Sequence, residues 1–240
     1  MMTLHFDTCT STNDVLRAEH GDMVLAVTDE QTAGRGQRGN QWHSVRGENL
    51  LFSVLLTPEA LSVSDGFVLS QAMALAIYHG LATCYALDGL SIKWPNDIYV
   101  KKRKICGILI ENELQGKRLC RSIVGCGINV NQTDFPKGLA VPATSVALET
   151  GHHVNRETLF SSVMQRFETL YNEICEGRYW GIREEYGRRL FMRGILARYI
   201  DANGEFYGKI ERVENDGHLI IVDAAGEICR YAFKEIRIVL

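Results

Sequence analysis

A loop rich in glycine, followed at once by an apolar run, constrains the fold of this chain more than any other stretch. Residues 31–56 read QTAGRGQRGNQWHSVRGENLLFSVLL. Gly34, Gly36 and Gly39 allow the backbone to approach a ligand closely and to take positive φ angles without a Cβ penalty. The segment therefore has the character of a binding loop, and a solvated glycine-rich loop is the alternative.

The spacing of these glycines matches G-x-G-x-x-G, the fingerprint of dinucleotide-binding folds. That fingerprint requires a strand before the glycines and a helix directly after them. Residues 23–27 fit the strand, but residues 40–49 have no apolar stripe of helical period, and residues 50–56 read as a buried strand. We therefore reject a Rossmann fold and expect a loop between two strands that orders when its ligand binds.

The same loop carries two arginines, Arg35 and Arg38. Guanidinium groups are planar donors with a fixed geometry that matches carboxylate and phosphate. The ligand of the loop is therefore expected to be an anion.

The composition is that of a globular protein without a strong charge bias. The 240 residues are 46% hydrophobic with a formal net charge of -3, enough for one core plus a small second module. The cations lie in short loops, so no nucleic-acid partner is expected. No signal-peptide pattern and no run near the roughly 18 apolar residues of a membrane span appear, so we expect no membrane partner and a cytoplasmic protein. The seven scattered cysteines read as reduced thiols, and no metal-ligand spacing is found.

Three stretches predict helices. A pattern that begins at Ser64-Asp65 predicts a core helix that ends near Asp88-Gly89, and Arg156 to Cys175 has apolar residues at intervals of three and four. Ser11 is placed to cap a short helix with its hydroxyl. Whether the side chains of residues 11–13 also face a ligand stays open.

The second informative stretch, KWPNDIYVKKRKICGILIEN from Lys93, predicts a hairpin. Its basic tip is expected to be solvated, whereas Lys104 abuts the buried strand 105–110 and can point into a pocket. A turn at Gln115-Gly116 leads to a strand over residues 122–130, and Asn129 and Asn131 at its end are turn formers or ligand donors. From about Phe191, short strands separated by turns that end in glycine predict a small barrel.

Several blocks, in order, resemble the biotin-protein ligases over nearly the whole chain. They are STN at 11–13, QTAGRGQRGNQW at 31–42, KWPND at 93–97, RKICGIL at 103–109 and GCGINVN at 125–131. The resemblance implies an α+β fold: a mixed β-sheet flanked by helices, of the class II aminoacyl-tRNA synthetase and biotin ligase type, over residues 1–190. A C-terminal SH3-like small β-barrel over residues 191–240 is implied to follow.

The family's chemistry sets the functional expectation. Its enzymes activate biotin with ATP and Mg²⁺ to biotinyl-5'-AMP, then pass biotin to a lysine of a biotin carboxyl carrier protein or domain of a carboxylase, such as acetyl-CoA carboxylase. Some members carry an N-terminal helix-turn-helix; the STN block begins about ten residues from residue 1, so no such domain is expected. A homodimer formed by sheet extension is left open.

The resemblance also assigns roles to residues. Lys104 is implied to contact the biotin carboxylate and the α-phosphate, Arg35 to brace the phosphate, and Asp97 to position Mg-ATP or the incoming lysine. The implied biotin site comprises Ser11, Thr12, Asn13, Gln31, Gly34, Arg35, Gly36, Gln37, Lys104 and Gly107. The implied nucleotide site comprises Arg35, Arg38, Trp42, Asn96 and Asn129.

Two alternatives compete with this interpretation. A lipoate or octanoate ligase has a related catalytic fold, but the KWPND block and the C-terminal barrel favour biotin. A non-catalytic biotin-binding protein is the other alternative, and the pair of cations Lys104 and Arg35 argues against it.

Gln37 departs from the family pattern, in which a second basic residue often follows G-R-G. An amide can donate to the ligand but cannot neutralise its charge, so we expect the adenylate to be held less firmly by electrostatics. Gln37→Arg should then tighten adenylate binding and reduce its leakage into solution. Equal affinity and equal leakage in the two proteins would contradict this expectation.

Overall fold

The computed structural model describes residues 2–59, 61–139 and 141–239, and within them the side chain of Arg38 is not described. The helices are α1 (Thr12–Leu16), α2 (Phe67–Cys84), α3 (Val146–Thr150), α4 (Arg156–Cys175) and α5 (Trp180–Arg188), with 3₁₀ turns η1 (Gln37–Gly39) and η2 (Val63–Asp65). The strands are β1 (Met2–Phe6), β2 (Val24–Thr28), β3 (Leu50–Leu56), β4 (Leu90–Lys93), β5 (Asp97–Val100), β6 (Arg103–Gln115), β7 (Arg118–Ile128), β8 (Ala197–Asp201), β9 (Gly204–Val213), β10 (Leu219–Asp223), β11 (Ile228–Tyr231) and β12 (Arg237–Ile238).

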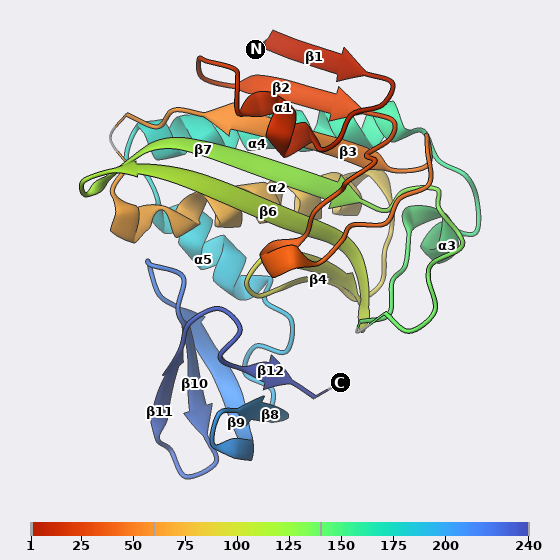
Figure 1. The fold of residues 1–240 in the computed structure, drawn as a ribbon. Helices are drawn as coiled ribbons and strands as arrows, with labels where there is room; N and C mark the ends of the chain where they lie inside the picture. The colour runs from red at the N-terminus through yellow and green to blue at the C-terminus, as the bar shows by residue number, and fades with distance from the viewer. Residues whose placement is uncertain (1, 60, 140, 240) are drawn as a thin grey trace.

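Two sheets organise the described part of the chain (Figure 1). The larger runs in the order β1-β2-β3-β7-β6-β5-β4, with β1 and β2 parallel and the other pairs antiparallel. The smaller is antiparallel, in the order β11-β10-β9-β8-β12. The predicted mixed sheet flanked by helices is confirmed, and the second sheet is consistent with the predicted SH3-like barrel.

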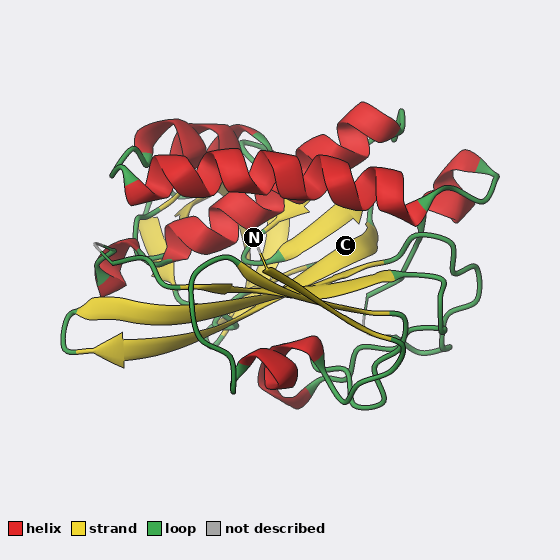
Figure 2. Cartoon of the chain, turned by 90° about the horizontal axis from the view of Figure 1, so that it is seen from above, coloured by secondary structure: helices red, strands yellow, loops and turns green. Residues whose placement is uncertain are grey.

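The two faces of the large sheet are covered unequally. Phe52 and Val54 point into the main core with α2 and α4, whereas Leu55 packs with Leu16 of α1 on the opposite face. Figure 2 shows the long helices on one side of the sheet and a short helix with loops on the other. The strand alternation thus separates a helix-covered face from a loop-covered face, and the site lies on the latter.

The central helix α2 is buried on nearly all sides. The stretch Val63–Cys84 is long and apolar enough to cross a membrane by composition, but 67% of its most apolar window is buried within the protein. A helix that is hydrophobic all round belongs in a core, which accounts for its composition.

Most predicted elements are found, with corrected limits. The strand at 50–56 and the helix Arg156–Cys175 are confirmed at the predicted residues. The core helix ends at Cys84 rather than near Gly89, because Tyr85 is extended and the Gly89 carbonyl accepts from the Lys101 amide in the β4–β5 hairpin. Strand β7 runs from 118 to 128 rather than from 122 to 130, because the tight turn at Gly116 lets the strand begin earlier than predicted.

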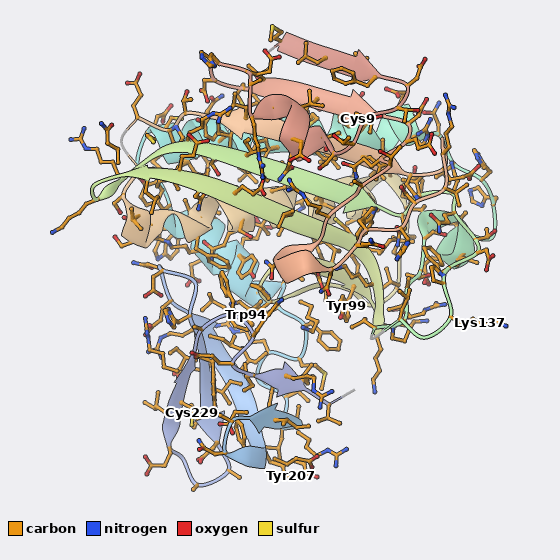
Figure 3. All side chains as sticks on the ribbon, in the orientation of Figure 1. Cys9, Trp94, Tyr99, Lys137, Tyr207 and Cys229 are labelled. Carbon is orange, nitrogen blue, oxygen red and sulfur yellow. The ribbon has the colours of Figure 1, made fainter. Side chains whose placement is uncertain are left out.

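The barrel is joined to the large sheet by aromatic packing. Phe233, in the turn between β11 and β12, has its ring centroid 5.4 Å from that of Trp94 and 5.6 Å from that of Phe67. Trp94 also donates from Nε1 to the Gly217 carbonyl at 2.8 Å. Figure 3 places Trp94 where the two units meet. The boundary between residues 190 and 191 stays a proposal.

The close approach of α2 to α4 generates a stability prediction. A Cβ at Gly80 would lie 2.6 Å from Cγ2 of the buried Val163. Overpacking of this kind costs about 1–3 kcal/mol and exceeds the gain of up to about 1 kcal/mol from replacing a helical glycine. Gly80→Ala should therefore lower the free energy of unfolding by about 1–2 kcal/mol in urea denaturation.

Gly181→Ala in α5 is the matched control, since a Cβ there would meet no described atom within 4 Å. It should leave stability unchanged or raise it slightly. Adding Val163→Ala to Gly80→Ala should recover part of the loss; an unaltered or higher stability of Gly80→Ala itself would contradict the packing argument.

Candidate active site

A cavity of about 240 Å³ opens on the loop-covered face of the large sheet. Its walls come from the start of α1, the glycine loop, the turn before β5, strands β6 and β7, and the turn between β11 and β12. The lining residues are Ser11, Thr12, Asn13, Gln31, Arg35, Gly36, Gln37, Asn40, Gln41, Trp42, Asn96, Asp97, Lys104, Gly107, Ile108, Leu109, Gly125, Cys126, Gly127 and Lys234.

The floor of the cavity exists because side chains are missing from neighbouring strands. Gly107 of β6 pairs with Gly127 of β7. A Cβ at Gly127 would come within 2.4 Å of the Trp42 indole, and one at Gly107 within 2.9 Å of Lys104 Nζ. A Cβ at Gly125 would lie 2.1 Å from Asn13 Oδ1. Any side chain at these positions would push the walls away, so the sheet itself must be bare there.

The wall from α1 is a directed chain of hydrogen bonds. Gln31 Oε1 accepts from the Thr12 amide at 2.8 Å, the Thr12 and Ser53 hydroxyl oxygens lie 2.6 Å apart, and the Ser53 hydroxyl donates to Asn13 Oδ1 at 2.6 Å. Because the Ser53 hydroxyl gives its one proton to Asn13, it can only accept from the Thr12 hydroxyl, which also has Gln31 Oε1 as an acceptor at 3.2 Å. The Asn13 amide Nδ2 then donates to Glu111 at 3.1 Å, which fixes the orientation of that amide.

Ser11 begins α1, but no described backbone amide bonds to its hydroxyl. The expectation that Ser11 caps the helix with its side chain is therefore wrong. As a residue Ser11 is buried, and it lines the cavity, which fits the alternative left open by the sequence.

A β-bulge aims Lys104 at the cavity. Cys106 pairs with Ile98 but Lys104 pairs with Tyr99, so Ile105 is an extra residue in β6. Both Ile105 and Cys106 point into the main core, which returns Lys104 to the face of the sheet that Gly107 occupies. Without the bulge, strict alternation would turn Lys104 toward the helices.

The ammonium of Lys104 lies between an acid and an aromatic ring. Its Nζ is 2.7 Å from Asp97 Oδ1 and 5.6 Å from the centroid of the Trp42 ring. Lys93 lies close behind this pair. Burial lowers the pKa of Lys93, the Asp97 carboxylate opposes this shift, and the Lys104 charge adds to it. A second, partly buried lysine therefore lies near the first.

Arg35 is paired with carboxylates at the mouth of the cavity. One of its terminal nitrogens donates to Asp14 at 2.7 Å and lies 3.4 Å from Glu111. Arg17 contacts the same two carboxylates, at 3.4 and 2.9 Å. The Nε of Arg35 is buried and has no partner among the described atoms. An anion that enters the cavity must therefore compete with Asp14 and Glu111 for this guanidinium.

Backbone hydrogen bonds close the glycine loop on itself. The Trp42 amide donates to the Gly34 carbonyl at 3.0 Å, and the Gly36 amide to the Asn40 carbonyl at 2.7 Å. Gly34 is buried behind the lining, where a Cβ would lie 2.9 Å from the Trp42 carbonyl oxygen. The indole Nε1 of Trp42 is buried without an acceptor in the part of the chain that is described.

Twelve of the predicted residues therefore come together in one cavity. They are Ser11, Thr12, Asn13, Gln31, Arg35, Gly36, Gln37, Trp42, Asn96, Asp97, Lys104 and Gly107. Gly34 supports the lining from behind. Arg38 contributes its backbone to η1, and its side chain is outside the described residues.

Asn129 is not brought to the cavity. It is buried, and its Nδ2 donates to the Thr144 carbonyl at 3.0 Å. Asn131 likewise bonds both the amide and the carbonyl of Val154, at 2.9 and 3.0 Å. Of the two interpretations of these asparagines, the contacts favour support of the chain after β7 over contact with a ligand.

Sequence reasoning missed three contributors, Ser53, Glu111 and Lys234, whereas the sequence predicts that the small residues Gly125 and Gly127 permit close approach to the backbone. Ser53 sits in an otherwise apolar strand, and a hydroxyl in the middle of LLFSVLL is the signal that could have found it. Lys234 lies in the barrel, and nothing local in the sequence links it to Lys104. Among the residues that the structure describes, no three His, Cys, Asp or Glu side chains cluster in a way that could hold a metal ion.

Comparison with known proteins places this site in a family. Residues 6–129, more than half of the chain, match the model of the biotin/lipoate A/B protein ligase family. A biotin--[acetyl-CoA-carboxylase] ligase of Paracoccus denitrificans is 33% identical over 207 residues, which cover 82% of this chain and 83% of that protein. A bifunctional ligase/repressor BirA of Bacillus spizizenii is 32% identical over 85% of this chain.

The chain spans 62% of the length of that Bacillus relative. Among solved structures, a biotin protein ligase from Aquifex aeolicus in complex with biotin and ATP superimposes with a TM-score of 0.82 at 26% identity, over 99% of this chain and 98% of the other. The family match and the Paracoccus relative together show that this chain belongs to the biotin/lipoate A/B protein ligase family.

Proposed function

We propose that this chain activates biotin with ATP to give biotinyl-5'-AMP and pyrophosphate, and then transfers biotin to a lysine of a biotin carboxyl carrier protein or domain. The observation that carries the proposal is the meeting of Lys104, a hydroxyl and amide wall, and a bare glycine floor in one cavity. Relatives named as biotin ligases, and the Aquifex structure that holds biotin and ATP, support the choice of substrates.

The first step joins two anions. A carboxylate oxygen of biotin attacks the α-phosphorus of ATP, the bond from that phosphorus to the bridging oxygen breaks, and pyrophosphate leaves with the electron pair. No protein nucleophile is needed, so the protein must hold the two groups together and offset their repulsion. Lys104 is suited to this, because its ammonium enters the cavity from the bulge in β6. Arg35 would exchange its carboxylate partners for the phosphate.

The polar wall is proposed to bind the ureido group of biotin. That group needs fixed donors and acceptors, and Thr12 and Asn13 line the cavity in orientations set by their hydrogen bonds to the buried Ser53. The apolar ring system would enter beside the Trp42 indole, which rests on Gly107 and Gly127.

Mg²⁺ is proposed to accompany ATP. A magnesium ion bound with a nucleotide is held largely by phosphates and water with one or two carboxylates. Asp97 is the carboxylate among the lining residues, so the residues present fit such an ion. Bound there, the ion would shield the phosphate charge.

In the second step the amine of the carrier lysine attacks the carbonyl carbon of the mixed anhydride, and AMP leaves. The carrier protein, a cytoplasmic location and a homodimer are further proposals. Seven free cysteines fit a reducing compartment. A second copy would add to β1, which forms one end of the large sheet as described, and a one-chain mass in sedimentation would contradict a dimer.

ATP-pyrophosphate exchange tests the proposed function most directly. The purified chain should exchange labelled pyrophosphate into ATP only when biotin is present, because exchange requires a reversible adenylate. Lipoate, octanoate and a reaction without acid are the matched controls.

Exchange with lipoate or octanoate but not with biotin would assign the chain to the other ligases of its family. Absence of exchange with every acid, together with calorimetric binding of biotin, would favour a biotin-binding protein and overturn the proposal.

Substitution of Lys104 tests the assigned cation. Lys104→Ala should reduce biotin-dependent exchange by at least about a hundredfold, because a charge-assisted contact to the reacting oxygens is lost. Biotin binding measured by calorimetry should be partly kept, since the α1 wall is untouched. Lys101→Ala at the exposed hairpin tip is the control, and full activity of Lys104→Ala would remove Lys104 from the mechanism.

A further inference from the structure

One wall of the cavity comes from the C-terminal unit. Lys234 lies in the turn between β11 and β12 and lines the same cavity as Lys104 and Arg35. It also lines a smaller cavity of about 130 Å³ between the two units, beside Lys93 and Trp94. A cation from a different unit therefore reaches the site.

The preceding residue holds this turn in place. Phe233 packs between Trp94 and Phe67 of the larger unit, with centroid separations of 5.4 and 5.6 Å. The turn is closed by Glu235, whose carboxylate accepts from the Ala232 amide at 2.7 Å and whose amide donates to the Ala232 carbonyl at 3.2 Å. Lys234 is thus carried to the rim of the cavity by an anchored turn.

The charges around the cavity show what Lys234 adds. Lys104 is 2.7 Å from Asp97, and Arg35 is 2.7 Å from Asp14. Lys234, by contrast, has no ion pair or side-chain hydrogen bond with any residue in the ranges 2–59, 61–139 and 141–239. Of the lining cations, it is the one whose charge is available without the release of a carboxylate.

The backbone at Lys234 is left-handed, with φ of +70°. This conformation suits glycine and is disfavoured for residues with a Cβ. A lysine there costs stability, and such local strain is a reason to look for a role in binding.

We propose that Lys234 binds the polyphosphate of the nucleotide, so that the C-terminal unit completes the active site. The inference rests on the proposed function for the identity of the anion. ATP brings several negative charges into a cavity whose inner cations are already paired, and a lysine ammonium is a strong point-charge donor to phosphate oxygens. The residues proposed to bind biotin lie on α1, away from the turn between β11 and β12. Biotin binding alone should therefore not need Lys234.

The test compares ATP and biotin binding in Lys234→Ala and Lys234→Gly. Both variants should bind ATP with Mg²⁺ about tenfold more weakly by calorimetry, with a matching rise in the KM for ATP in exchange, while the Kd for biotin stays unchanged. Lys234→Arg should retain most of the affinity. Lys209→Ala, at an exposed lysine of β9 outside the cavity lining, should bind both ligands as the unaltered chain does.

Lys234→Gly separates folding from binding, because glycine accepts the left-handed backbone and should not lower stability. Unchanged ATP affinity in both variants would overturn the proposal, and so would equal losses of ATP and biotin affinity, which would indicate a structural role. A direct measurement of ATP binding also tests the role of Lys234 separately from the proposed ligase function. If the unaltered chain binds ATP through Lys234 but shows no biotin-dependent exchange, the proposed function fails and the role of Lys234 stands.

Discussion

Gly107 and Gly127 lie side by side in the ladder of β6 and β7, and the missing side chains leave the sheet bare where the Trp42 indole rests. The rest of the site depends on this arrangement. With the indole seated on the sheet, the loop from Gly34 closes through its own backbone hydrogen bonds, and Lys104 lies over the ring at 5.6 Å. A methyl group in the ladder would displace the loop, the aromatic ring and the ammonium together.

The inner charges of the cavity are balanced before any ligand arrives. Lys104 forms an ion pair with Asp97, and both Arg35 and Arg17 form ion pairs with Asp14 and Glu111. Paired charges in a partly desolvated cavity are less costly than isolated ones. An anionic ligand that contacts Lys104 or Arg35 must therefore compete with the carboxylates that already pair with them. Glu111 also bonds the Asn13 amide, so the polar wall and the arginine share one carboxylate.

The two units share a continuous hydrophobic core, and Trp94 and Phe233 pack together where they meet. Trp94 belongs to the same short block as Asn96 and Asp97, which line the cavity. Within this block, Trp94 contacts the barrel, and Asn96 and Asp97 line the cavity. This arrangement gives a physical reason for the barrel to stay at the mouth of the cavity, where Lys234 reaches the site.

The sequence by itself determined the elements whose signal is local. The apolar run at 50–56 and the 3.6-residue period of 156–175 were found where expected, and the glycine loop, the KWPND block and Lys104 could be singled out as candidates. Tertiary structure alone decided which way those residues face. The bulge at Ile105 turns Lys104 to the cavity, hydrogen bonds bury Asn129 beside Thr144, and the docking of Phe233 brings Lys234 near a lysine 130 positions earlier in the chain. These outcomes depend on strand register and on packing between distant segments, and neither leaves a periodic pattern in the sequence.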